Sequence, residues 1–147
     1  MKIPKIAHLV WNHRGVLESD HPLMQNGLHS LIRLNPDWKV TVYTPTEVDA
    51  DLRSLLSAED YDAVSKRNFV SRIDLWRLFK MFNEGGLYLD IDKMVNVPLS
   101  EVIGEGISWV LPTTREYDFS CDLLLSAPGN PEQKTAYEMY LARMNSG

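Results

Sequence analysis

Cysteine, long apolar runs and excess positive charge are scarce or missing in this sequence. Its single cysteine, Cys121, has no partner for an intramolecular disulfide or a zinc knuckle, which suits a reducing compartment, so we expect a cytoplasmic protein. No stretch of about 18 apolar residues is present, and the N-terminus shows no cleavage site, so we expect neither a transmembrane segment nor a signal peptide. The net charge of -5 argues against a nucleic-acid partner, because phosphate-backbone binders present a basic surface.

The chain is nevertheless rich enough in apolar residues to fold. It has 147 residues, of which 44% are hydrophobic, and this is the size and composition of one ordinary domain with its own core. We therefore expect one domain over residues 1–147. An anionic ligand would need a local positive group, such as a metal ion or a few arginines.

Apolar patterns predict strands and helices that alternate along the chain. Strands are predicted at residues 5–10, 38–43, 87–92, 95–99, 107–111 and 123–126. Helices are predicted at residues 23–34, in one or two pieces over 46–66, at 71–84 and at 131–144. The helix over 71–84 is the clearest, because Leu75, Leu78, Phe79 and Phe82 form an apolar stripe. This interleaving predicts a layered α/β fold.

Asp90 and Asp92 are the strongest candidates for chemistry. Residues two apart in a strand point to the same side, so a strand over 87–92 would aim both carboxylates at one point. Mg²⁺ and Mn²⁺ prefer such oxygen ligands and fill their other positions with water and substrate phosphates. An Asp-x-Asp tripeptide alone is weak evidence. Its setting strengthens the hypothesis, because ligands of open α/β sheets bind at the carboxyl ends of strands.

Two segments together resemble a known family. Residues 71–92, SRIDLWRLFKMFNEGGLYLDID, and residues 3–11, IPKIAHLVW, resemble glycosyltransferases with a DXD sugar-binding region. These are the family 32 type, which is also similar to the catalytic domains of large clostridial glucosylating toxins. The resemblance implies a GT-A fold, a Rossmann-like α/β arrangement with a mixed, mostly parallel sheet flanked by helices.

The resemblance also implies roles for individual residues. Asp90 and Asp92 would hold Mn²⁺ or Mg²⁺ against the donor diphosphate, and together with Arg77 they are the expected catalytic residues. Asp74 and Arg77 would contact hydroxyls of the donor sugar, and Trp11 would stack on the nucleobase. The expected donor site is completed by Tyr88, Gly85 and Gly86.

The implied reaction is metal-dependent transfer of a sugar, with retention of configuration, from a nucleotide sugar such as a UDP- or GDP-sugar. The acceptor would be a carbohydrate or glycoconjugate, that is, a glycan, lipid or protein. Such chemistry depends mainly on positioning and on stabilising the charge of the departing diphosphate, so it needs no obvious protein nucleophile.

The sequence departs from the family in two places. Ile73 precedes Asp74 where the family commonly has a serine, so a hydroxyl contact to the donor is not expected here. The chain also ends sooner after Asp92 than family members do, so the resemblance leaves two expectations open: a domain truncated at its C-terminus without acceptor recognition, or acceptor recognition supplied elsewhere.

Other hypotheses stay open. The chain fits a non-catalytic module that binds a nucleotide sugar or glycan. An aspartate-based phosphohydrolase with Asp90 as nucleophile is disfavoured, because Lys93 and its neighbours include no threonine shortly after Asp92.

Simple structural roles also remain for several residues. Asp74 and Arg77 have the spacing of a helix-surface ion pair, and Trp11 suits core packing as well as base stacking. Gly85-Gly86 is expected to end the helix before it. Cys121 is expected to be a small buried residue. The four histidines lack the spacing of a zinc site.

Overall fold

The computed structural model describes residues 1–18, 21–115 and 118–146. Its centre is a five-stranded sheet in the order β2-β1-β3-β7-β4. The strands are β1 (Ile6–Val10), β2 (Lys39–Tyr43), β3 (Gly86–Leu89), β4 (Trp109–Val110) and β7 (Leu123–Ser126). β1 is parallel to β2 and β3, whereas β7 is antiparallel to β3 and β4. The predicted mixed, mostly parallel sheet is thus confirmed.

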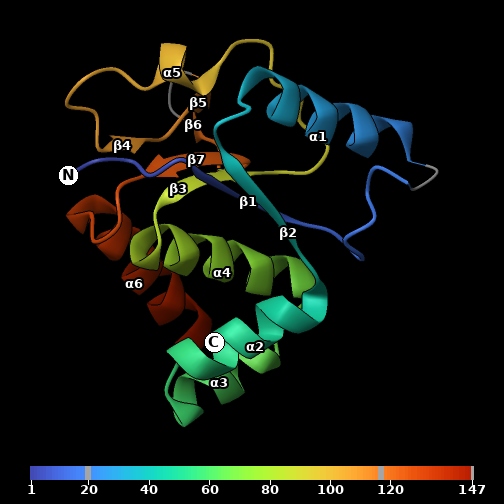
Figure 1. Ribbon diagram of the computed structural model, residues 1–147. Helices are drawn as coiled ribbons and strands as arrows, with labels where there is room; N and C mark the ends of the chain where they lie inside the picture. Colours follow the sequence, from blue (N-terminus) through green and yellow to red (C-terminus); the bar gives the residue numbers. More distant parts are fainter. Residues whose placement is uncertain (19–20, 116–117, 147) are drawn as a thin grey trace.

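Helices cover both faces of this sheet (Figure 1). They are α1 (Pro22–Leu34), α2 (Pro45–Leu55), α3 (Ala58–Ser65), α4 (Phe69–Asn83), α5 (Leu99–Val102) and α6 (Pro131–Asn145). Figure 1 shows α1 on one face and α4, with α6 beside it, on the other. A short hairpin of β5 (Thr113–Arg115) and β6 (Asp118–Phe119) forms a second sheet. Among the described residues, no helix has the length and apolarity needed to cross a membrane.

Successive side chains of the strands point to opposite faces of the sheet, and an apolar core lies on each face. Leu9 of β1 and Leu87 of β3 belong to the cluster that also contains Leu28 and Leu31 of α1. Tyr88, one position along β3, belongs instead to the cluster formed with α4 and α6. Both faces of β1 and β3 are therefore buried, as expected for the central strands of an α/β sheet.

The helix α4 begins and ends at recognisable residues. Asn68 caps it by accepting a hydrogen bond from the Ser71 backbone N–H at 2.8 Å. The helix ends before Gly85 and Gly86, which have φ values of 70° and 96°. A Cβ on Gly86 would lie 2.2 Å from the carbonyl oxygen of Ile6, so β3 can lie this close to β1 only with glycine there.

The middle of α4 is buried on all sides rather than along one stripe. Trp76, Arg77 and Lys80 are as inaccessible as the predicted core residues Leu75 and Leu78. The cause is tertiary packing, because α4 lies against the sheet on one side and contacts α2 and α6 on others. The helix-surface ion pair considered for Arg77 is therefore largely enclosed.

Three predicted strands differ in the structure. β3 ends at Leu89, and Asp90 and Lys93 instead close a turn, with the Lys93 N–H donating to the Asp90 carbonyl at 3.1 Å. Residues 95–99 form no strand, and their last residue begins α5. The strand predicted at 107–111 is shortened to β4. Other predicted helices and strands agree to within two or three residues, and residues 46–66 form the two helices α2 and α3.

Candidate active site

A cavity of about 340 Å³ opens where β1 and β3 end. It is lined by Val10, Trp11 and Asn12 at the end of β1, Met24 of α1, Phe69, Val70, Ile73 and Arg77 of α4, and Tyr88, Asp90, Ile91 and Asp92 at the end of β3. β1 is followed in the chain by β2 on one side, while β3 lies on its other side. The strand order thus reverses at β1. Ligands of open α/β sheets bind at such a switch point, outside the carboxyl ends of the strands.

Arg77 is the central charged residue of this site. One of its terminal nitrogens lies 3.0 Å from a carboxylate oxygen of Asp74, and the other lies 3.4 Å from Asp90. The second nitrogen also donates to the Cys121 carbonyl at 2.5 Å. The Arg77 Nε is buried and has no hydrogen-bond partner among the described residues. The guanidinium is therefore held in place by α4, by the residue after β3 and by the segment that precedes β7.

Asp90 and Asp92 have different environments. The Tyr88 hydroxyl donates to Asp90 at 2.7 Å, so this half-buried carboxylate is held by Tyr88 and Arg77. Burial raises the pKa of Tyr88, which keeps its hydroxyl protonated as a donor. Asp92 is exposed at the mouth of the cavity. Although β3 ends too early for strand alternation to align them, both carboxylates line the same cavity.

This pair of carboxylates fits a metal ion that binds mainly through its substrate. Among residues 1–18, 21–115 and 118–146, no group of three or more His, Cys, Asp or Glu side chains is arranged to hold a metal. Mg²⁺ and its analogues commonly bind through one or two carboxylates, with phosphates and water as the other ligands. Asp90 and Asp92 satisfy that requirement, whereas a site made entirely of protein ligands is not present in this part of the chain.

Asp74 is linked to the cavity through its ion pair with Arg77. It is half-buried and is not itself among the lining residues. Burial raises the pKa of its carboxyl group, which the neighbouring Arg77 charge and a hydrogen bond from Tyr140 partly counteract. Tyr140 belongs to α6, so a helix near the end of the described chain contributes to this carboxylate's position.

Trp11 forms a wall of the cavity and also packs against the core. Its ring is partly buried, and it contacts His21 edge to face with a centroid distance of 5.4 Å. Its indole N–H is buried and has no partner among the described residues. The geometry therefore permits both roles that its sequence position suggested.

Gly85 and Gly86 lie away from this cavity. They stand at the amino end of β3, whereas the cavity is at its carboxyl end. A Cβ on Gly85 would lie 2.7 Å from Pro128, and its carbonyl oxygen lies 3.0 Å from His8 Nε2. Both glycines thus have a packing function, and neither lines the cavity.

Sequence reasoning was wrong about Cys121 and missed several wall residues. Cys121 is exposed rather than buried, and its backbone carbonyl is what contacts Arg77. The missed wall residues are Asn12, Met24, Phe69, Val70 and Ile73. A usable signal existed for the α4 residues, because apolar side chains in the first turns of α4 lie outside its predicted core stripe.

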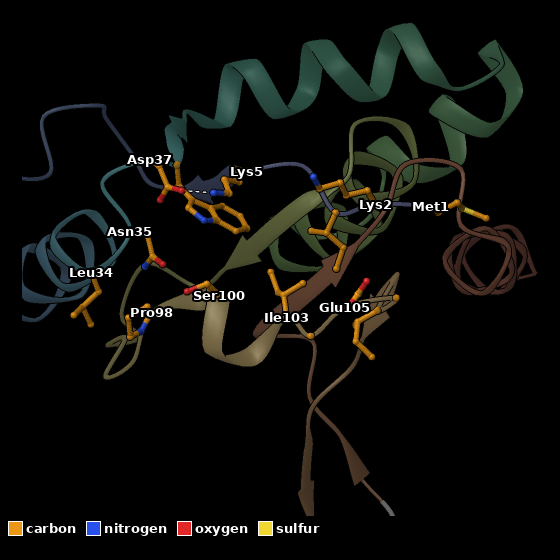
Figure 2. A pocket seen from close by; sticks show the side chains of 15 residues that line it. Met1, Lys2, Lys5, Leu34, Asn35, Asp37, Pro98, Ser100, Ile103 and Glu105 are labelled. Atoms are coloured by element: carbon orange, nitrogen blue, oxygen red, sulfur yellow. Dashed lines mark hydrogen bonds and ion pairs between the residues drawn. The ribbon is translucent and has the colours of Figure 1, made fainter.

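A second cavity, of about 440 Å³, lies at the amino ends of β1 and β2 (Figure 2). It is bounded by the N-terminal segment, the turn between α1 and β2, and α5, and the ion pair of Lys5 and Asp37 lies in its wall. Neither Asp90 nor Asp92 lines it. The smaller cavity at the carboxyl ends of β1 and β3 is therefore the candidate active site.

Known proteins are similar to this chain in sequence and in fold. The family described as a glycosyltransferase sugar-binding region containing a DXD motif matches residues 21–109, which is more than half of the chain. Inositol phosphoceramide mannosyltransferase 1 of Schizosaccharomyces pombe is 23% identical over 133 residues, which cover 88% of this chain and 40% of that protein.

Two solved structures resemble this fold. The PaToxG glycosyltransferase superposes with a TM-score of 0.65 at 16% identity, covering 99% of this chain and 62% of that one. A transferase mutant in which cysteines are replaced by serine gives a TM-score of 0.50 at 12% identity, covering 95% of this chain and 79% of that one. This chain thus spans less than two thirds of both the mannosyltransferase and the PaToxG chain. The fold is that of GT-A glycosyltransferases, and the chain belongs to the family of glycosyltransferases whose sugar-binding region contains the DXD motif.

Proposed function

We propose that this chain forms the donor-binding part of a metal-dependent, retaining glycosyltransferase that uses a nucleotide sugar. The observation that supports this most directly is the convergence of Trp11, Arg77, Tyr88, Asp90 and Asp92 on one cavity at the ends of β1 and β3. These residues come from three separate segments, and their functional groups match the base, sugar and diphosphate of such a donor. The acceptor is proposed to be a carbohydrate or glycoconjugate.

Each part of the donor has a suitable partner. The indole of Trp11 offers a flat face to the nucleobase, and a base-to-aromatic stack contributes roughly 1–3 kcal/mol. The guanidinium of Arg77 can donate paired hydrogen bonds to sugar oxygens or phosphate. Asp74, held beside Arg77, would accept hydrogen bonds from sugar hydroxyls.

Asp90 and Asp92 would hold Mn²⁺ or Mg²⁺ at the diphosphate. When bound, such an ion stabilises the negative charge that develops on the departing diphosphate. The protein's part is to fix the geometry. Tyr88 and Arg77 orient Asp90, while the exposed Asp92 remains free to bind an ion carried in with the donor.

The central experiment is calorimetric titration of UDP and GDP, with and without Mn²⁺, into the wild type and the Asp92→Asn variant. We expect nucleotide binding that tightens with Mn²⁺ in the wild type and loses this dependence in Asp92→Asn. Asp62→Asn on the exposed surface of α3 is the matched control and should behave as the wild type. Metal-independent nucleotide binding in the wild type would contradict the metal-site assignment.

Turnover separates an enzyme from a binding module. Nucleotide release should be measured with a panel of UDP- and GDP-sugars, beginning with mannose donors, because the curated relative is named a mannosyltransferase. The anomeric configuration of any product, observed by NMR, tests retention. Metal-dependent binding without turnover on any donor would favour the non-catalytic module.

A further inference from the structure

The turn that contains Asp92 lies beyond the strand pairing of the sheet. Ladder pairing of β3 with β7 ends at Leu89, which pairs with Leu123. Asp90 still receives one backbone contact, since its N–H donates to the Asp122 carbonyl at 2.9 Å. Beyond it Lys93 Nζ lies 3.2 Å from a carboxylate oxygen of Asp122, and the chain passes α1. The position of Asp92 therefore depends on contacts other than strand pairing.

Helix α1 meets the chain on both sides of Asp92 at Gly27. A Cβ on Gly27 would lie 2.6 Å from the Lys93 carbonyl oxygen and 2.8 Å from the Ile91 carbonyl oxygen. These two carbonyl groups belong to the residues immediately before and after Asp92. Both neighbours are backbone atoms, which cannot move aside as the end of a flexible side chain can. The helix and the turn can therefore approach this closely only with glycine at position 27.

Ser30, one turn further along α1, attaches the same segment by hydrogen bonds. Its hydroxyl accepts from the Val95 N–H at 2.8 Å and donates to the Gly27 carbonyl at 2.7 Å. Ser30 is only 3% exposed, so water does not compete effectively for these bonds. At the end of α1, the Asn35 side chain accepts from the Leu99 N–H at 2.7 Å. Residues 91–99 are thus fixed along one helix.

We propose that Gly27 and Ser30 are positioning residues for the metal site. They would hold the turn of residues 90–93 so that the Asp92 carboxylate stays at the mouth of the cavity, near Asp90. Neither residue lines that cavity, so each acts through the backbone around Asp92. This inference rests on the proposed function, because it assigns these residues to the binding of the metal and the donor diphosphate.

The test compares Gly27→Ala with Gly104→Ala. A Cβ on Gly104 would meet nothing closer than the Ile107 side chain at 3.7 Å, so this control adds the same methyl group in open space. Mn²⁺ binding is measured by electron paramagnetic resonance, and GDP and UDP affinity by calorimetry at several Mn²⁺ concentrations. We expect Gly27→Ala to need roughly tenfold more Mn²⁺ for the same nucleotide affinity, and Gly104→Ala to match the wild type.

Ser30→Ala provides a second variant in case Gly27→Ala does not fold, which circular dichroism would show. It removes the bond to Val95 but adds no bulk, and we expect a threefold to tenfold weaker response to Mn²⁺. Affinity for nucleotide without metal should be unchanged in both variants. Folded variants with the wild-type Mn²⁺ response would overturn the proposal, as would equal losses with and without metal, which indicate a merely structural role. Absence of any Mn²⁺ effect in the wild type would instead overturn the proposed function, and this inference with it.

Discussion

The guanidinium of Arg77 lies over the ring of Tyr88, with its central carbon 4.2 Å from the ring centroid. The hydroxyl of the same tyrosine donates a hydrogen bond to Asp90, whose carboxylate also lies within 3.4 Å of Arg77. Arg77, Tyr88 and Asp90 therefore form a closed triangle of contacts beside the cavity. A change in any one of them should alter the position of the other two.

Replacement of Arg77 by lysine should be harmful although the charge is kept. A point-like ammonium cannot contact Asp74, Asp90 and the Cys121 carbonyl together, as the planar guanidinium does. We expect affinity for a nucleotide sugar to fall at least about tenfold, which is about 1.4 kcal/mol, and more than affinity for the free nucleoside diphosphate. Calorimetry with both ligands measures this, with the exposed Arg53→Lys as control. Equal losses for the two ligands would argue against a role at the sugar.

Removal of the Tyr88 hydroxyl should loosen Asp90. Tyr88→Phe keeps the ring under Arg77 but leaves the Asp90 carboxylate without its 2.7 Å hydrogen bond. We expect a loss of about 1 kcal/mol in the free energy of unfolding and a weaker Mn²⁺ dependence of nucleotide binding. Urea denaturation and metal titration measure the two effects. An unchanged metal response would mean that Asp90 is positioned without the tyrosine.

Truncation of Trp11 should weaken nucleotide binding through the lost stack. Trp11→Ala is expected to lower nucleotide affinity about tenfold or more, within the roughly 1–3 kcal/mol of a base-to-aromatic contact. Trp11→Phe keeps an aromatic face and should retain most of the affinity, although it removes the buried indole N–H, which has no partner among the described residues. Since Trp11 also packs against the core, unfolding must be measured in parallel. Similar affinities of the two variants would assign Trp11 to packing alone.

His8 should make the fold less stable in mild acid. Its side chain is buried, with Nδ1 3.1 Å from the Tyr43 hydroxyl and Nε2 3.0 Å from the Gly85 carbonyl oxygen. Burial lowers the pKa of His8 below its ordinary value of 6.5, more than the nearby Glu84 raises it. The unfolded chain therefore binds a proton more readily than the folded one. The stabilising contribution is complete above pH 6.5 and is lost as the pH falls through the lower folded-state pKa.

The measurement is urea denaturation between pH 8 and pH 5 of the wild type and of His8→Gln. The wild type should lose stability relative to the variant as the pH falls, by about 1.4 kcal/mol for each unit by which the pKa is lowered. The charges of Lys80 and Asp51 also face this site, and both proteins retain them. Parallel pH profiles would show that folding does not lower the pKa of His8.

Much of this fold follows from local patterns. The stripe over residues 71–84 and the glycines after it identified α4, because helical spacing and a positive-φ stop are properties of a short segment. The grouping of Trp11, Arg77, Asp90 and Asp92 at one cavity also agrees with the sequence argument, since β1 and β3 are neighbouring parallel strands. Their chemical roles remain predictions.

The differences arise where tertiary contacts replace local ones. The apolar alternation of β3 continues to Ile91, but Ile91 is buried in the core cluster shared with α1 after the strand has ended. Val95 and Leu99 suggested a strand, yet their N–H groups donate to side chains of α1 and of the residue that caps it. Arg77 contacts Asp90 and the Cys121 carbonyl, which are far away from it in the sequence. Such partners cannot be identified from a window of neighbouring residues.

The close approach of Gly86 to Ile6, at the amino ends of β3 and β1, also affects the carboxyl ends of these strands. The Gly86 contact lies at the amino end of β3, and the pairs Ala7–Leu87 and His8–Tyr88 follow directly from it. Trp11 and Asp90 directly follow the carboxyl ends of the same two strands. A larger residue at position 86 would push β1 and β3 apart, and the gap between indole and carboxylate would widen. The spacing of these two side chains across the cavity is thus set in part by a glycine at the far end of the strands.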